Sequence, residues 1–478
     1  MNRTLPTLFL VSMLTALSSA KAETNRPYQG NVIGSLLGAP YTIDPVFASS
    51  HADSTLISLV FDTLYKTDKD GRVLPHLASG FPTYNEEGTE AKIHLLEGIR
   101  FHRGGVLTPK DVVESLRRVE KYGWALAGIT TISIEGKDIV LKSAEPILYL
   151  LERLSLTQTA ITRGGVAPTF RKADGTGPFR MLSFRNRFRE VRLRRFEQHF
   201  NGPTFLETLR LRWYLEQDAE ARAYESGTVQ YSLRGEVAFT GHQPKFETSV
   251  VESPAAVLKY LGLGTRFKSQ VAFRRALSLA IGRRSLSNIG TGETVFPTLS
   301  PVLDTLDAPA IPMDADGTRA RFFLEKVKRN DSLEDLTVAV DRTRPGDRAV
   351  AEKIVASLFR IGQKATIIEL SSAEFFSNTK TGSADLFIGE VAFPSHLPLM
   401  QLLASIPNLN DRRRVLTSKE DYQSGLRWFS KELPVVPLYH RTIRVHHQRN
   451  VRGLSFTKSG AMPLDDLFVF GGVRKNRR

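Results

Sequence analysis

Cysteine is absent from all 478 residues of this sequence. Without thiols the chain can form no disulfide bond and no thiolate metal site, so its stability must come from an apolar core. A hydrophobic content of 41% is sufficient for such a core. A lipoprotein signal is also excluded, because the residue that carries the lipid is a cysteine. We therefore expect a protein without a lipid anchor.

Long apolar runs are missing beyond the first residues. Arg3, an apolar run over 8–17 and the small-residue segment Ser19-Ala20-Lys21-Ala22 together have the pattern of a cleavable signal peptide. The alternative, a buried N-terminal helix, does not explain this cleavage motif. No other segment approaches the roughly 18 apolar residues that span a bilayer. We expect removal of 1–22 and an exported, soluble protein, which only an outer membrane would retain, so a periplasm is the predicted location.

Motifs of catalysis are missing as well. The sequence contains no His-Glu-x-x-His, no Gly-x-Ser-x-Gly and no phosphate-binding loop, and Gly290-Thr291-Gly292 lacks the third glycine of a dinucleotide fingerprint. The one histidine cluster is His440, His446 and His447, and the adjacent pair would point to opposite faces of a strand. We therefore predict no enzymatic activity, no catalytic residues, no metal site and no cofactor.

Positive charge is in excess, with a net charge of +15 that falls to +13 when Arg3 and Lys21 leave with the signal peptide. Such an excess suits an anionic ligand, an anionic membrane surface or nucleic acid. The basic residues are spread along the chain, which argues against nucleic acid. The one dense run, 185–195, alternates charged and apolar residues in its second half, a pattern typical of a solvated strand face.

Local patterns predict several elements. The polar segment 68–71 between two apolar runs indicates a hairpin, and alternation over 93–101 indicates a strand. Thr108 is the expected N-cap of a helix, with Pro109 at its first position and Asp111 at its third. A second predicted helix covers 270–288, after a strand at 257–263.

Residues 335–370 predict a βαβ unit. Apolar runs at 336–340 and 365–370 flank a helix at 350–361, with Gly362 just after its end. The crossover makes the two strands parallel. A short helix at 373–379 and a strand at 385–391 extend this pattern, so this lobe is predicted to be α/β.

Four short motifs follow one another along the chain. They are Phe61-Asp62-Thr63-Leu64-Tyr65, Gly71-Arg72-Val73-Leu74-Pro75-His76, the turn Gly175-Thr176-Gly177-Pro178 and the segment Leu433-Pro434-Val435-Val436-Pro437-Leu438-Tyr439. In this order and spacing the chain resembles the extracellular solute-binding proteins of family 5, which capture peptides, nickel chelates and similar solutes for ABC importers. One departure is Gly282, where the family usually has Asp.

The resemblance implies an α/β fold, a two-lobed periplasmic-binding-protein-like clamp of type II in its three-domain variant. After the signal peptide at 1–22, we expect domain I at 23–47, 174–252 and 450–478, domain II at 48–173 and domain III at 253–449. It also implies a monomer that captures a small-molecule or peptide solute by hinge closure and delivers it to an inner-membrane ABC permease. The alternative is a sensor or envelope interaction protein, built on the same clamp, that does not transport.

Candidate ligand-binding residues follow from the resemblance. Tyr41 and Phe393 lie in segments that border the cleft in the family; Trp124, Trp213 and Tyr214 are further aromatic candidates, with core packing as the alternative for each. Peptide-binding members carry an Asp in the loop that here contains Phe393, Ser395 and His396, and Glu390 is the one nearby acid. Ordinary peptide recognition is therefore in question, because a buried ammonium without a counter-ion is costly.

Arg266 is the last candidate, since it falls at the position of the family's hinge turn. A guanidinium there could form a bidentate pair with a carboxylate or phosphate of the solute. A surface arginine near a domain crossover is the simpler interpretation. No partner among nucleic acids is expected.

Overall fold

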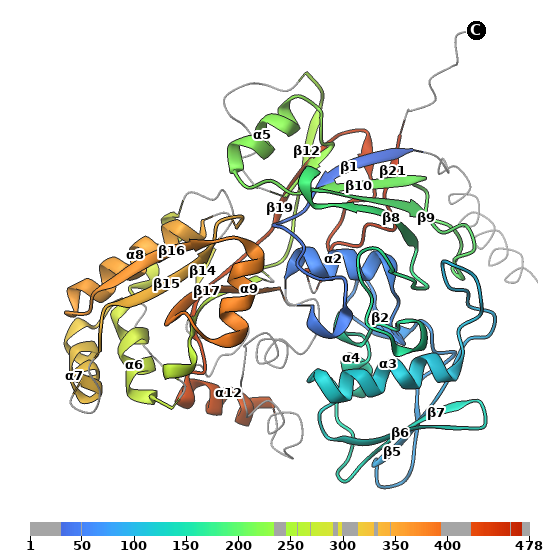
Figure 1. Cartoon of the computed structure of the whole chain (residues 1–478), viewed down its shortest axis with the longest axis horizontal. Helices are drawn as coiled ribbons and strands as arrows, with labels where there is room; N and C mark the ends of the chain where they lie inside the picture. Colours follow the sequence, from blue (N-terminus) through green and yellow to red (C-terminus); the bar gives the residue numbers. More distant parts are fainter. Residues whose placement is uncertain are drawn as a thin grey trace, which may run out of the picture.

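The computed structural model of the protein describes residues 30–48, 50–233, 245–255, 257–267, 269–289, 295–298, 314–328, 333–344, 346–392, 422–458 and 460–470. The chain forms two lobes (Figure 1). One lobe contains the residues up to 252 and from 444 onward, and the other contains those between 257 and 441. No helix in these ranges is long and apolar enough to cross a membrane.

The first lobe is built on a mixed seven-stranded sheet whose central strand, β1, is parallel to both its neighbours. The order is β12 (Thr248–Glu252), β19 (Arg444–Gln448), β11 (Tyr231–Ser232), β1 (Asn31–Ser35), β10 (Thr208–Arg212), β9 (Glu190–Arg195) and β8 (Phe179–Arg185). Helix α2 (His51–Val60) packs on one face, where Leu56 and Val60 join Val191 and Leu209 in one core. Helix α5 (Gln217–Glu225) covers part of the opposite face near β1 and β11.

A smaller sheet extends the same lobe. Its order is β4 (Thr83–Tyr84), β5 (Glu90–His94), β7 (Asp138–Ser143) and β6 (Ile129–Glu135). Helix α3 (Pro109–Tyr122) covers it, with Val112, Leu116 and Val119 buried against Ile93 and Leu141. This spacing of three and four residues places the apolar side chains on one helical face.

The second lobe has a six-stranded sheet with helices on both faces, the arrangement of an α/β fold. Its order is β14 (Val295–Pro297), β18 (Val436–Arg441), β13 (Val257–Leu263), β17 (Leu386–Ala392), β15 (Leu336–Asp341) and β16 (Ala365–Leu370). One face packs against α6 (Val271–Ala280), α7 (Gly317–Lys328) and α8 (Asp347–Arg360). The other packs against α9 (Ser372–Thr381) and α12 (Tyr422–Glu432).

Most predicted elements are confirmed. Strands β2 (Tyr65–Thr67) and β3 (Val73–Pro75) form the hairpin around 68–71. Thr108 caps α3 and forms a capping box with Asp111. Strands β15 and β16 are parallel and flank α8, and Gly362 has a φ of 81° after its end, the left-handed conformation that glycine adopts most readily.

Two predicted elements were too long. The strand predicted over 93–101 ends at His94, and residues 97–98 form a bend in which Gly98 has a φ of 79°. The helix predicted over 270–288 ends at Ala280, because Ile281 and Gly282 adopt extended backbone angles. A separate 3-10 helix, Arg283–Asn288, follows this break.

The lobes are joined by two adjacent chain crossings, one between β12 and β13 and one between β18 and β19. They are hydrogen-bonded to each other: the Ser253 amide donates to the Ile443 carbonyl at 2.9 Å, and the Ile443 amide donates to Ser253 Oγ at 2.7 Å. The second crossing thus lies at 442–443, whereas the predicted boundary of domain III was at 449. The chain returns earlier because β19 pairs with β11 and β12. Two adjacent crossings that run in opposite directions form a hinge.

The turn before β8 is fixed to the C-terminal end of α2. The Gly177 amide donates to the Val60 carbonyl at 3.0 Å, and Thr176 Oγ1 donates to the buried carboxylate of Asp62 at 2.8 Å. A Cβ atom on Gly175 would lie 2.0 Å from the Val60 carbonyl oxygen. Only glycine fits there without displacement of the end of α2.

We therefore predict that Gly175→Ala lowers the free energy of unfolding by about 3 kcal/mol, the upper range for an overpacked site. Gly80→Ala is the matched control, because no atom lies within 4 Å of its Cβ position. Urea denaturation of the two variants checks the prediction. Equal stability of the two variants would contradict it.

Candidate functional site

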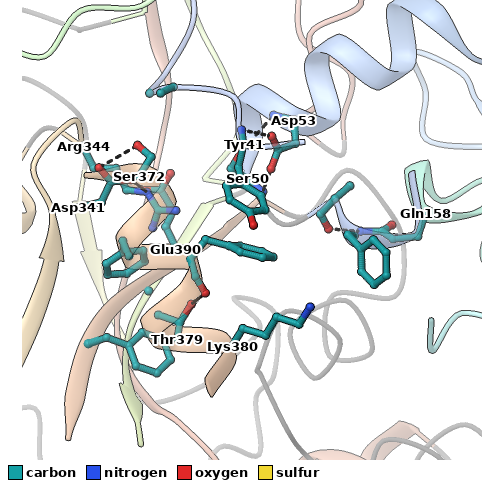
Figure 2. Close-up of a pocket in the computed structure, with 18 of the residues that line it drawn as sticks. Tyr41, Ser50, Asp53, Gln158, Asp341, Arg344, Ser372, Thr379, Lys380 and Glu390 are labelled. Atoms are coloured by element: carbon teal, nitrogen blue, oxygen red, sulfur yellow. Dashed lines mark hydrogen bonds and ion pairs between the residues drawn. The ribbon is translucent and has the colours of Figure 1, made fainter. Parts of the chain in front are cut away.

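A cavity of about 350 Å³ lies between the lobes. The first lobe contributes the segments around Tyr41, Ser50 and Trp124, and the second lobe contributes residues of β13, β15, β17 and α9. Figure 2 shows side chains from both lobes converging on this space. Concave sites between domains are where small ligands bind most often.

A second cavity, of about 460 Å³, adjoins the first and shares Ala48, Ser50 and Gln158 with it. It runs along α2 and is closed by the C-terminal residues 460–466. The two cavities therefore adjoin each other at the N-terminus of α2.

Tyr41 is held at the mouth of the first cavity by the N-terminal cap of α2. Its backbone amide donates to Asp53 Oδ1 at 2.7 Å, and Asp53 also forms a capping box with Ser50 (Figure 2). The Tyr41 ring stacks on Phe376 of α9 at 3.8 Å between centroids. Nearby, Lys380 Nζ lies 5.3 Å from the ring centroid of Phe47. Both contacts join one lobe to the other, so they form only when the lobes are close together.

Glu390 lines the floor of the first cavity, and its charge is already engaged. Lys259 Nζ lies 2.7 Å and an Arg441 guanidinium nitrogen 2.8 Å from Glu390 Oε2. Lys259 also pairs with Asp347. These residues come from β13, β17, β18 and α8, so four elements of the second lobe converge on one buried ion cluster beside the hinge.

The electrostatics of this cluster keep Glu390 ionised. Burial alone would raise the pKa of its carboxyl, but the positive charges of Arg441, Lys259 and Arg344 outweigh burial and hold the pKa well below its ordinary value. Burial would likewise lower the pKa of Lys259, and the charges of Asp347 and Glu390 raise it instead. Burial raises the pKa of Asp347 to about 6 in spite of Lys259 and Arg344, so Glu390 stays ionised while Asp347 takes up a proton in mildly acidic solution.

Asp341 and Arg344 form a second polar group in the wall (Figure 2). Asp341 accepts hydrogen bonds from Thr343 and Ser372, and Arg344 Nε lies 3.6 Å from its other oxygen. The Arg344 guanidinium also lies 5.0 Å from the ring centroid of Phe375. A solute at this wall would contact the guanidinium of Arg344. The carboxylate nearest to that group, Asp341, already accepts hydrogen bonds from Thr343 and Ser372.

The structure brings some of the predicted residues together and separates others. Tyr41, Glu390 and Trp124 line the first cavity. Arg266 is exposed, with its guanidinium 5.4 Å from the Phe267 ring centroid, and it lines neither cavity. Trp213 and Tyr214 line neither cavity either: Trp213 is buried in the core of the first lobe, and Tyr214 packs beside Tyr224 under α5. Phe393, Ser395 and His396 lie outside the described residues.

Sequence reasoning did not find Asp341, Arg344, Ser372 and the α9 residues of the wall. One signal was available. Asp341 and Arg344 follow the first strand of the predicted βαβ unit, and ligands of α/β proteins bind at the carboxyl ends of parallel strands. The contribution of α9 depends on how the lobes approach each other, which no local pattern encodes.

Seven carboxylates line the two cavities in the described part of the chain, and each has a polar or charged partner. They are Asp53, Asp62, Asp68, Asp341, Glu390, Asp465 and Asp466. Within the same ranges, no group of three or more His, Asp or Glu side chains is arranged to hold a metal ion.

Comparison with known proteins agrees with this geometry. The model of the bacterial extracellular solute-binding proteins, family 5, matches residues 72–404. The uncharacterized protein YhjP of Bacillus subtilis is 24% identical over 469 residues, which cover 90% of this chain and 75% of that protein.

Solved structures have the same fold. The oligopeptide-binding protein AppA of B. subtilis, in complex with a nonapeptide, superposes with a TM-score of 0.79 at 15% identity and covers 93% of this chain and 100% of its own. The binding protein AgaA of A. tumefaciens R10, in complex with agropinic acid, gives a TM-score of 0.76 at 18% identity and covers 92% and 99%. The predicted α/β two-lobed clamp is thereby confirmed.

Because the family model matches more than half of the sequence, the chain belongs to the bacterial extracellular solute-binding proteins of family 5.

Proposed function

We propose that this protein is the periplasmic receptor of an ABC importer, which captures a small solute between its lobes and presents it to an inner-membrane permease as a monomer. The observation that carries this proposal is the cavity whose wall is contributed by both lobes. Contacts that a solute makes to both walls exist only when the lobes are together. Such a solute shifts the population toward the closed form.

The charges of the cleft narrow the class of solute. A peptide with a free α-ammonium needs a carboxylate without another cation, since an unpaired buried charge is strongly unfavourable. Glu390 is shared by Lys259 and Arg441, so it does not offer a free counter-ion for an ammonium group. We infer a solute that is anchored by its apolar or ring-bearing body beside the stacked rings of Tyr41 and Phe376 and near Trp124, and not by an ammonium group at Glu390.

Proteins with this fold bind solutes of different size and charge. AppA holds a nonapeptide and AgaA holds agropinic acid, so the same clamp accepts both a long peptide and a small acid in those two proteins. No enzymatic step is part of the proposal. Retention and release of the solute are sufficient for a receptor.

We expect the solute to be retained when the protein is purified without denaturation, and to be identified by native mass spectrometry. Titration of that solute into Tyr41→Ala should show affinity lower by about tenfold, ~1.4 kcal/mol, because the ring is one wall of the cavity. Tyr84→Ala, at an exposed position of β4 outside both cavities, is the control. Equal affinity of both variants for the solute would remove the cavity at Tyr41 as the binding site.

A second prediction concerns the ion cluster. Glu390→Gln should lower the free energy of unfolding by about 3 kcal/mol, since it leaves Lys259 and Arg441 with one carboxylate fewer in a buried setting. Glu369→Gln breaks a solvent-exposed ion pair with Arg348 in the same lobe and should leave the stability almost unchanged.

The stabilisation that Glu390 provides depends on pH. A carboxyl whose pKa is depressed in the folded state contributes stability above its unfolded pKa, about 4.3, and loses that contribution as the pH falls toward the folded value. Below about pH 5, where Asp347 with its raised pKa of about 6 is largely protonated, the difference between wild type and Glu390→Gln should shrink as the pH falls further. Denaturant titrations across this range check it. A difference that grows on acidification would contradict the paired state of Glu390.

A further inference from the structure

The outer face of β8, β9 and β10 carries six arginines in adjacent rows. The strand register places Arg185 beside Glu190 and Glu190 beside Arg212 in one row, Arg192 beside Arg210 in the next, and Arg180 beside Arg194 in the third. We call this set the arginine face: Arg180, Arg185, Arg192, Arg194, Arg210 and Arg212. Alternate residues of these strands, such as Val191 and Leu211, point into the core.

Two carboxylates meet these six guanidinium groups. Glu190 accepts hydrogen bonds from Arg192, Arg210 and Arg212, and Glu207 lies 3.9 Å from Arg194. Burial would raise the pKa of Glu190, but these arginine hydrogen bonds outweigh burial and lower the pKa to about 2. Arg180 and Arg185 form no ion pair with any described residue. The face therefore keeps a large positive excess.

The turn between β8 and β9 extends this charge to an exposed tip. All five residues at 185–189 are exposed, and three of them are arginines. Between Arg187 and Arg189 the side chain of Phe188 is 67% exposed. Leu182, on the edge strand β8, is 53% exposed. Basic residues that flank a solvent-exposed aromatic ring are typical of segments that settle at a membrane interface.

This surface is separate from the solute cleft. No residue of β8, β9 or β10 lines either cavity. β8 is the edge strand of the seven-stranded sheet, and in Figure 1 it lies on the lobe away from α9 and β17. Helix α5 covers the β1 and β11 side of the same outer face; Arg180, Arg185 and Arg194 are exposed, and Arg192, Arg210 and Arg212 are partly exposed. A basic surface on the outer face of one lobe can contact a partner while the lobes move.

We propose that the arginine face and the β8–β9 tip dock the protein on an anionic phospholipid surface. Complementary charge favours this partner, because anionic headgroups attract each basic side chain within a Debye length. Phe188 adds an apolar contact that neither a nucleic acid backbone nor free phosphate would use. The proposal gives a role to the one dense basic run of the sequence, which solute capture leaves unexplained.

The test is co-sedimentation of the full chain with vesicles. Wild-type protein should bind vesicles rich in phosphatidylglycerol and not vesicles of phosphatidylcholine alone, and raising the salt from about 0.1 M to about 1 M should release it, since the Debye length falls from about 10 Å to about 3 Å. The tip variant Arg185→Ser/Arg187→Ser/Phe188→Ser and the face variant Arg180→Ser/Arg194→Ser should each bind about tenfold or more weakly.

Helix α8 on the other lobe offers a matched control. Phe359 is 70% exposed and is followed by the exposed Arg360, so Phe359→Ser/Arg360→Ser removes an equivalent ring and charge elsewhere. This variant should bind the vesicles like wild type. Equal weakening in the control, binding to phosphatidylcholine as strong as to phosphatidylglycerol, or no binding at low salt would each overturn the proposal. Binding to immobilised polyglutamate without binding to vesicles would overturn it in favour of an acidic polypeptide partner.

Discussion

Two buried cations, Lys259 and Arg441, converge on one carboxylate oxygen of Glu390 at the edge where the chain crosses between the lobes. Arg441 is the last residue of β18, directly before the crossing at 442–443, and Lys259 is the third residue of β13, the strand that follows the other crossing. The cluster thus ties both crossings of the hinge to the floor of the cleft. Because the ion cluster holds β13, β17 and β18 together, the lobes can rotate about the crossings while the cavity wall on the second lobe keeps its shape.

The same cluster limits what the cleft can recognise. A carboxylate that neutralises two cations is no longer a counter-ion for a solute, so the walls must select by shape and by their aromatic rings. The ring stack between Tyr41 and Phe376 spans the lobes in the structure and forms an aromatic wall of the cavity, against which a flat or apolar group can pack. The ion cluster that stabilises the second lobe and the aromatic residues that contact the solute are therefore different parts of one site.

The sequence predicted the elements with strong local signals. The capping box at Thr108, the hairpin at 68–71 and the βαβ unit at 335–370 each depend on neighbours a few residues apart, and each is confirmed. The helix over 270–288 was too long because apolar spacing continues through Gly282, whereas the backbone breaks there. Glu390 was placed near the cleft by resemblance, but its partners Lys259 and Arg441 lie 131 and 51 positions away in the chain and meet it only through strand order. Arg266 illustrates the converse: it was expected at the hinge turn, but it follows the end of β13 that is distant from the crossing and lines neither cavity.

The central claim is that a solute closes the lobes about this hinge, and an intramolecular distance tests it most directly. The chain has no cysteine, so Glu120→Cys on α3 and Lys431→Cys on α12 would carry the only spin labels, at exposed sites on opposite lobes. Double electron–electron resonance should show the distance between these labels shift to shorter values when the retained solute is added back to stripped protein. An identical distance distribution with and without a solute that demonstrably binds would contradict the account.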